Sequence, residues 1–229
     1  GVAKEELGNP NRFSNRPKNT SAYSDMAYEH CVKADALRIR NYFLESIEEY
    51  KKSIKYNPKN PDAQKGMGIS YKHIHKIKNA LEELEKAKKL SSFDKEIYYE
   101  LGLCYMKDNN ASLAIKNLIK AIKLDHTFYD ALYNLAVAHE MIDEPEMAKM
   151  VYLKVIENRP SYIAAYNNLG SLYIREKDYI NAIKIFKRLI SINAEFIRAY
   201  LGIAIAFDKM EKLSEARRYY KKYIELKPS

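Results

Sequence analysis

The residue types that could serve catalysis or metal binding are few in this chain, and their spacing suits neither. His73 and His75 lie two residues apart, so on a helix their side chains would point in different directions. The run His139-Glu140-Met141 lacks the second histidine of a zinc-protease motif. No Cys or His pairing has metal-ligand spacing, and no nucleophile, base and orienting group can be assembled. We therefore predict that the chain is not an enzyme and uses no cofactor or metal.

Several of these residues fit a packing role better. Gly66-Met-Gly68 looks like a fragment of a phosphate-binding loop, but the repeat described below places it inside a helix. His139 takes the place of a core aromatic and is expected to be buried and hydrogen-bonded. Cys31 and Cys104 lie two repeats apart, so we expect no disulfide, and Cys104 should behave as a small buried apolar residue. Two unpaired thiols favour a reducing compartment, and we predict a cytoplasmic protein.

A pattern of large and small residues recurs every 34 residues from Ala27 to Ser229, without insertion or deletion. Large residues at positions 4, 7 and 11 of each copy, with Gly or Ala at position 8, follow the three-and-four spacing of one helix face. Ala or Ser at position 20 and a large residue at position 24 predict a second helix. The copies are 27–60, 61–94, 95–128, 129–162, 163–196 and 197–229, after a polar N-terminal extension at 1–26. Each copy is predicted to be a helix-turn-helix unit whose small residues let its helices approach closely.

Turn-forming and helix-ending residues fall between the predicted helices. Pro145 suits the first turn of a helix, where its missing N–H is not needed. The second helices of three copies should end at prolines, because proline cannot continue them. The turn formers are Asn41, Asn109-Asn110, Asp143-Glu144-Pro145 and Lys177-Asp178, and the terminating prolines are Pro58, Pro160 and Pro228.

The copy at 163–196 carries the pattern most fully, reading YNNLGSLY and, after eight residues, AIKIF. Its pattern residues are Tyr166, Leu169, Gly170, Tyr173, Ala182 and Phe186. The chain thereby resembles the tetratricopeptide repeat (TPR) family, and the resemblance covers about nine tenths of it. Two departures from the family pattern are that no copy has Trp at position 4 and that three copies lack Pro at position 32. A further departure is Lys33 where Leu is expected, so the first copy's helix should be the least well packed.

The resemblance implies an all-α solenoid of six repeats and twelve helices, wound as a right-handed superhelix. It also implies a non-catalytic scaffold or adaptor whose first helices line a concave groove, with positions 2, 5, 6, 9, 12 and 13 facing it. We predict that a peptide or helix of a partner protein binds there, because apolar and tyrosine side chains gather at positions 5 and 9. The groove residues, as we call this candidate site, are Tyr99, Leu103, Met106, Tyr133, Asn134, Val137, Met141, Asn167 and Asn168.

Within the groove residues, the polar side chains have two interpretations. Asn134 and Asn168, at position 6 of consecutive copies, could bond a peptide backbone or be solvated or locally bonded. The acids Asp62, Glu96 and Asp130, at position 2, could form a rim for a basic ligand or favour the helix starts on which they lie. The lysine and asparagine pattern of the clamp that binds chaperone C-terminal tails in this family is absent.

Charge is unevenly distributed along the chain, whose net charge is +9. The fourth copy is acidic, whereas the last is the most basic and carries Arg217, Arg218, Lys221 and Lys222. A solvated helix face is the simplest interpretation, with nucleic acid or an anionic membrane surface as alternatives. No nucleic-acid reading motif accompanies the charge, so no specific nucleic-acid partner is predicted. No apolar run approaches 18 residues, so no transmembrane helix is predicted.

The two ends of the array allow other functions. The extension at 1–26 is polar, and a helix is expected to start after Ser24-Asp25. This extension could mediate self-association, making the chain a self-assembling scaffold. The chain stops at the end of copy six, so we favour a fragment of a longer protein. In that case the array could select substrates for a larger enzyme, such as a glycosyltransferase.

Overall fold

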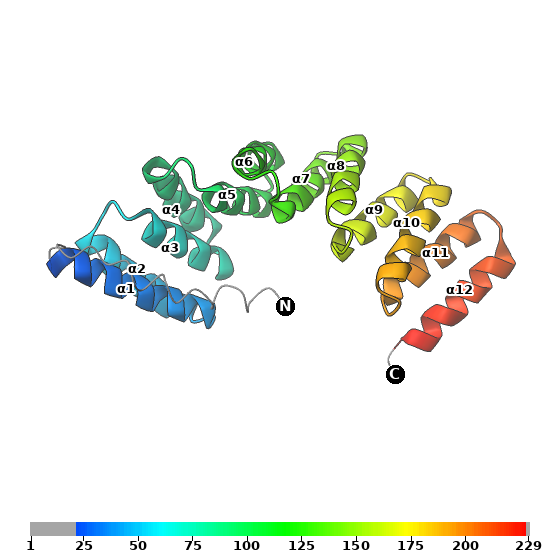
Figure 1. Ribbon diagram of the computed structural model, residues 1–229, viewed down its shortest axis with the longest axis horizontal. Coiled ribbons are helices and arrows are strands. Elements are labelled where there is room, and N and C mark those ends of the chain that lie inside the picture. Colours follow the sequence, from blue (N-terminus) through cyan, green and yellow to red (C-terminus); the bar gives the residue numbers. More distant parts are fainter. Residues whose placement is uncertain (1–21, 228–229) are drawn as a thin grey trace. The chain divides into compact units, whose positions relative to one another are not determined.

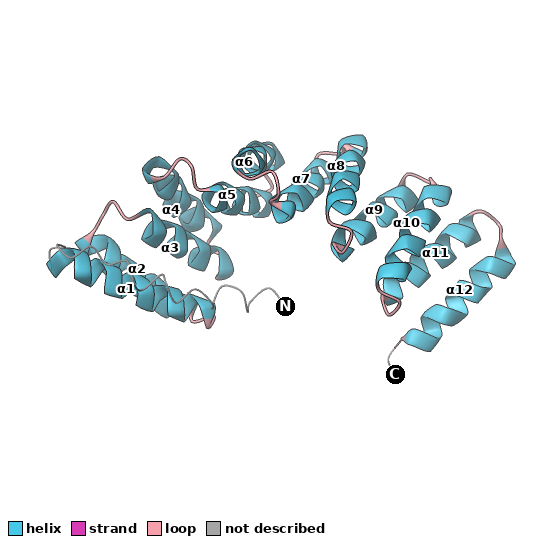
Figure 2. Ribbon diagram, in the orientation of Figure 1, coloured by secondary structure: helices cyan, strands magenta, loops and turns pink. Residues whose placement is uncertain are grey.

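The computed structural model describes residues 22–227, and all the regular structure within that range is α-helical (Figure 2). Most of the N-terminal extension, with its predicted self-association, and Pro228 lie outside the described residues. The chain divides into two compact units, at 1–91 and 92–229. The first contains α1 (Ala22–Ile39), α2 (Phe43–Tyr56), α3 (Pro61–His73) and α4 (Ile77–Leu90) (Figure 1). The second contains α5 (Lys95–Lys107), α6 (Ala111–Leu124), α7 (Tyr129–Met141), α8 (Pro145–Asn158), α9 (Ile163–Arg175), α10 (Tyr179–Ile192), α11 (Ile197–Lys209) and α12 (Leu213–Leu226).

The helix bounds follow the 34-residue period. Every first helix ends at position 13, and every second helix runs from position 17 to position 30 of its copy. Within each unit, consecutive helices pack on each other, and first helices of neighbouring copies also touch. The predicted all-α repeat solenoid, with its helix-turn-helix copies, is confirmed.

The start of α1 departs from the expectation. Ser24 and Asp25 lie inside this helix, which begins at Ala22. The prediction of a start after these two residues is therefore wrong. The ring of Tyr23 lies 6.0 Å from the ring of Tyr56 in α2, so the additional turn packs against its own repeat.

Small residues at position 8 make room for the large residue at position 24, as the pattern predicts. A Cβ atom added to Gly102 would lie 2.7 Å from Cγ of Leu118, and one added to Gly170 would lie 2.6 Å from Cζ of Phe186. The copies with Gly at position 8 have Leu or Phe at position 24, whereas the copies with Ala there have Tyr. These tyrosines are Tyr50, Tyr152 and Tyr220.

The turn between the two helices of each copy has one unusual residue. Position 15 adopts a left-handed backbone with φ between 56° and 64°, although no copy has glycine there. The six residues are Asn41, His75, Asn109, Asp143, Lys177 and Glu211. His75 is therefore in a turn, outside the helix that ends at His73.

The least buried helix is α12, so the prediction that it would be the first copy's helix is wrong. Only Ala216 is buried in α12, whereas α1 buries three residues. Lys33 avoids the core by pairing through Nζ with Oε1 of Glu49 at 3.0 Å. On α12, Leu213 and Ile224 are each 67% exposed because no described helix packs beyond it.

The other candidates from the sequence fall into structural roles. Cys104 is fully buried, as predicted, and burial together with nearby carboxylates raises the pKa of Cys31 to about 12. His139 is buried, with Nδ1 2.6 Å from Oε2 of Glu144, so its predicted role is confirmed. The Gly66-Met-Gly68 run lies inside α3. Within residues 22–227 no cluster of His, Cys, Asp and Glu could hold a metal ion, and no helix has the length and apolar character needed to cross a membrane.

Candidate protein-binding surface

All nine groove residues lie in the second unit, on the first helices α5, α7 and α9. Their positions in the repeat are equivalent from one helix to the next, since the helix bounds repeat without slippage. Met141 is 40% exposed and the other eight are half-buried. The candidate site is therefore a set of partly accessible side chains on three neighbouring helices.

Hydrogen bonds join the tyrosines of this set to the asparagines one copy later. The side-chain amide of Asn134 donates to the phenolic oxygen of Tyr99 at 3.3 Å. The amide of Asn168 donates to the phenolic oxygen of Tyr133 at 2.9 Å. Asn134 also donates to the backbone oxygen of Asp130 at 2.8 Å. The amide groups expected to orient a peptide thus already bond within the protein.

A chain of polar contacts behind Asn168 was not predicted from the sequence. Its amide also lies 3.2 Å from the hydroxyl of Tyr152, a fully buried residue of α8. Tyr152 in turn donates to Oε1 of Glu140 at 2.6 Å. Glu140 accepts from Nη2 of Arg175 at 2.6 Å through its other oxygen. This chain links α7, α8 and α9, and it places an ion pair beside the groove residues.

Aromatic packing surrounds the two tyrosines of the site. The ring of Tyr99 lies 4.8 Å from that of Phe128, and the ring of Tyr133 lies 5.4 Å from that of Tyr162. Burial raises the pKa of Tyr99 and of Tyr133, so both phenols are neutral at physiological pH. The two tyrosines are held as fixed, neutral acceptors.

The acidic residues at position 2 have different partners in different copies. Asp130 accepts a hydrogen bond from the hydroxyl of Tyr162 at 2.7 Å. Asp62 lies 3.6 Å from Nζ of Lys65. Both, like Glu96, lie in the first turn of their helices, where a negative charge is favourable. These contacts favour the helix-start interpretation over a rim for a basic ligand.

Asn167 and the apolar groove residues differ in their surroundings from the two bonded asparagines. The amide of Asn167 lies 3.3 Å from Oδ1 of Asn168 and makes no inter-repeat bond in the described residues. Met106 and Val137 pack partly against the core of the second unit, and Leu103 is half-buried on α5. The accessible apolar part of the site therefore consists of Leu103, Met106, Val137 and Met141, of which Met141 is the most exposed.

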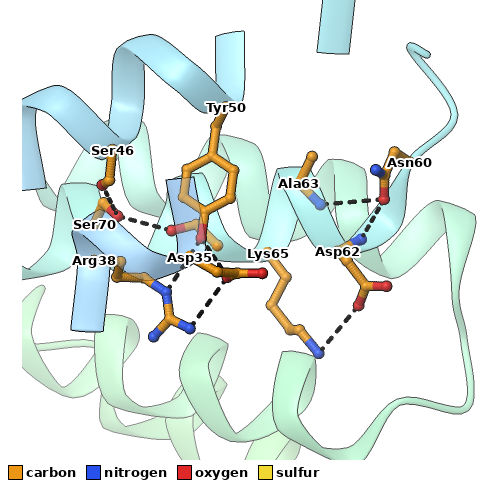
Figure 3. A network of polar contacts seen from close by, with 10 residues as sticks. Asp35, Arg38, Ser46, Tyr50, Asn60, Asp62, Ala63, Lys65 and Ser70 are labelled. Atoms are coloured by element: carbon orange, nitrogen blue, oxygen red, sulfur yellow. Dashed lines mark hydrogen bonds and ion pairs between the residues drawn. The ribbon is translucent and has the colours of Figure 1, made fainter. Parts of the chain in front are cut away.

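In the first unit, a network of charged and polar side chains includes Asp35 and Arg38 of α1 (Figure 3). At position 9, where Leu103 and Val137 occur in later copies, α1 has Asp35, which accepts from the hydroxyl of Tyr50 at 2.7 Å, whereas α3 has the half-buried Ile69. Arg38 donates through Nε to the same hydroxyl at 3.2 Å and pairs with Asp35 at 3.3 Å. An apolar ligand would therefore meet a charged cluster at this place on α1.

The sequence contained a signal for the tyrosine–asparagine bonds. Tyr occupies position 5 in two copies, and Asn follows at position 6 of the next copy each time. The partners are separated by 35 residues, one more than the repeat, so comparison of equal positions does not pair them. Glu140 and Arg175 are also 35 residues apart, so the same comparison of equal repeat positions does not pair them.

Comparison with known proteins agrees with the geometry. Models of the tetratricopeptide repeat match residues 95–127, 130–162 and 161–229, together more than half of the chain. A search of curated protein sequences found no match.

Solved structures resemble the chain at low sequence identity. PilF of Pseudomonas aeruginosa is 16% identical with a TM-score of 0.74, over 91% of this chain and 95% of its own. The C-terminal part of a TPR repeat-containing protein of Cytophaga hutchinsonii is 22% identical with a TM-score of 0.79, over 86% and 78%. YrrB, described as a TPR protein with an unusual peptide-binding site, is 20% identical with a TM-score of 0.65, over 78% and 96%.

At these identities the likeness to solved structures is one of fold. Repeats of this kind serve generally as protein-interaction scaffolds. Since its period, its helix register and the family models agree, the chain belongs to the tetratricopeptide repeat family.

Proposed function

We propose that this protein is a non-catalytic scaffold that binds a peptide or helix of a partner protein on the accessible surface of α5, α7 and α9. The observation that carries the proposal is the row of partly exposed apolar side chains on consecutive first helices, Leu103, Val137 and Met141. Apolar side chains at a defined spacing on a rigid frame are what an interface core requires. That YrrB, of the same fold, has a peptide-binding site adds support.

The hydrogen-bonding pattern refines the role of each predicted residue. Tyr99 and Tyr133 pair with Asn134 and Asn168, so these four hold neighbouring helices in place. They stay available to a ligand mainly through their half-exposed ring and amide edges. In this proposal the binding energy comes from the apolar residues, and Asn167 is the amide left to contact a ligand backbone.

The test compares two variants that make the same chemical change at different places. In the first, Leu103→Gln is combined with Met141→Gln. In the control, Ile119→Gln is combined with Met150→Gln, which removes apolar surface from the second helices α6 and α8, where these residues are 38% and 55% exposed. Proteins captured from a lysate by wild type and by each variant are quantified by mass spectrometry, after melting curves show that all three are folded.

We expect a protein that wild type and the control capture equally and that the first variant captures at least about tenfold less. Each of the two replaced apolar side chains should contribute on the order of 1 kcal/mol to the binding free energy. Binding of a segment of that protein to purified wild type would then identify the ligand. Equal capture by both variants would remove the surface of α5, α7 and α9 from consideration.

A further inference from the structure

A cavity of about 410 Å³ opens between α10 and α12 in the second unit, on helices other than those that carry the groove residues. Its buried side is aromatic and aliphatic, and its exposed side is basic. Tyr200, Tyr219 and Ile190 form the buried side, and Lys187, Arg218, Lys221 and Lys222 surround the opening. Tyr200 is 8% exposed and donates its hydroxyl to the backbone oxygen of Ala194 at 2.9 Å, so it closes the base of the cavity.

Most of the positive charge around this cavity has no carboxylate partner among the lining residues. Glu225 is the one carboxylate among the lining residues, and it lies 3.5 Å from Nζ of Lys222. The remaining three cations surround the opening without an acidic partner in the cavity. An anionic ligand would be attracted there, most strongly at low ionic strength.

The equivalent place one repeat earlier has a different arrangement. There Arg188 lies 5.4 Å above the ring of Tyr166, which is fully buried. Lys222 has the same repeat position as Arg188, but it pairs with Glu225 at the edge of the cavity. The cation at this repeat position therefore has a different partner in the last repeat, where it lies at the edge of the opening between α10 and α12.

We propose that this cavity binds an acidic peptide segment in which an apolar residue is flanked by Asp or Glu. Carboxylates would pair with the cations at the opening while the apolar side chain enters against Tyr219 and Ile190. A flat bilayer would reach the lysines but not the recessed apolar base. Nucleic acid binds most strongly where several bases stack on aromatic rings, whereas here one face of the Tyr219 ring is already stacked on Phe207 at 5.7 Å, which leaves at most its other face.

The test measures fluorescence anisotropy of a labelled peptide in which Phe is flanked on each side by three Glu residues. Wild type is compared with Arg218→Glu combined with Lys221→Glu. The control, Lys116→Glu combined with Lys123→Glu, makes the same change in net charge on α6, outside the cavity. We expect the variant with Arg218→Glu and Lys221→Glu to bind the peptide at least about tenfold more weakly than wild type and the α6 control do. Two attractions between a cation and a peptide carboxylate become repulsions in that variant.

A milder variant, Lys187→Gln with Lys222→Gln, is measured in parallel in case charge reversal perturbs α12, and it should also weaken binding. A peptide with Gln in place of Glu should bind weakly to every variant. Equal affinity of wild type and both cavity variants, or equal binding of the Gln peptide, would overturn the proposal. So would binding of anionic vesicles or a single-stranded oligonucleotide, lost in the cavity variants, when the acidic peptide does not bind.

Discussion

The side-chain amide of Asn168 donates a hydrogen bond to the phenolic oxygen of Tyr133, 35 residues earlier, at 2.9 Å. The pair Asn134 and Tyr99 repeats this relationship one copy before, at 3.3 Å. Each bond crosses from one first helix to the next, so it fixes neighbouring repeats through their first helices as well as through core packing. Two features predicted for ligand binding therefore stabilise the array itself.

Breaking one of these bonds should lower the free energy of unfolding. We expect Tyr133→Phe to cost about 1 kcal/mol and Asn168→Ala about 1–2 kcal/mol, the usual range for a partly buried hydrogen bond. In the double variant the combined loss should be smaller than the sum, because both changes remove the same bond. Urea denaturation of the four proteins measures this coupling.

The control for this cycle is Tyr129→Phe. Tyr129 is also half-buried and lies 5.9 Å beneath the guanidinium of Arg159, but its hydroxyl has no hydrogen-bond partner among the described residues. Loss of the Tyr129 hydroxyl should change the free energy of unfolding little. Strict additivity of Tyr133→Phe and Asn168→Ala would show that the hydrogen bond between these residues contributes nothing to stability.

The sequence predicted the helices well because their positions depend on a period that all six copies share. The repeat pattern places residues such as Ala182 and Phe186 on the buried face of a second helix, and both are buried in α10. The contacts of Asn168 and Tyr152 escaped prediction because they join different positions of different copies. They depend on side-chain reach across the helix interface, which a pattern of apolar residues does not encode.

The left-handed turn residues were missed for another reason. Asn and Asp tolerate this conformation, but Lys177 and Glu211 are not residues that indicate it. Replacing either with glycine should raise the free energy of unfolding by about 0.5–1 kcal/mol, since relief of left-handed strain exceeds the added entropy of the unfolded chain. Asn109→Gly, at the same repeat position, should gain less. The ranking is checked by chemical denaturation, and a loss of stability in Lys177→Gly would contradict it.

The close approach at position 8 predicts a steric penalty. Gly102→Ala should destabilise the second unit by about 1–3 kcal/mol, because its Cβ would lie 2.7 Å from Cγ of Leu118. In a Leu118→Ala background the same change should no longer destabilise, since the obstructing atoms are gone, and the helix preference of alanine should make it slightly stabilising. Thermal melts of the four proteins separate this steric effect from the intrinsic helix preference of alanine, which would stabilise the helix in both backgrounds.

Acid sensitivity of the first unit should depend on Glu49, a buried carboxylate whose Oε2 lies 2.6 Å from Nδ1 of His30. Burial alone would raise its pKa, but hydrogen bonds from Lys52, His30 and Lys33 outweigh burial and lower the pKa from 4.5 to about 2. The Glu49 carboxyl binds its proton less tightly in the folded chain than in the unfolded chain. Its contribution to the free energy of unfolding is therefore fully present above pH 4.5 and is lost as the pH falls toward 2.

Glu49→Gln should therefore reduce the loss of stability over that pH range. Glu48→Gln, whose native side chain is 64% exposed beside Lys51, should leave the dependence of stability on pH nearly unchanged. Equal slopes for both variants, measured by urea denaturation at several pH values, would show that acid sensitivity arises elsewhere.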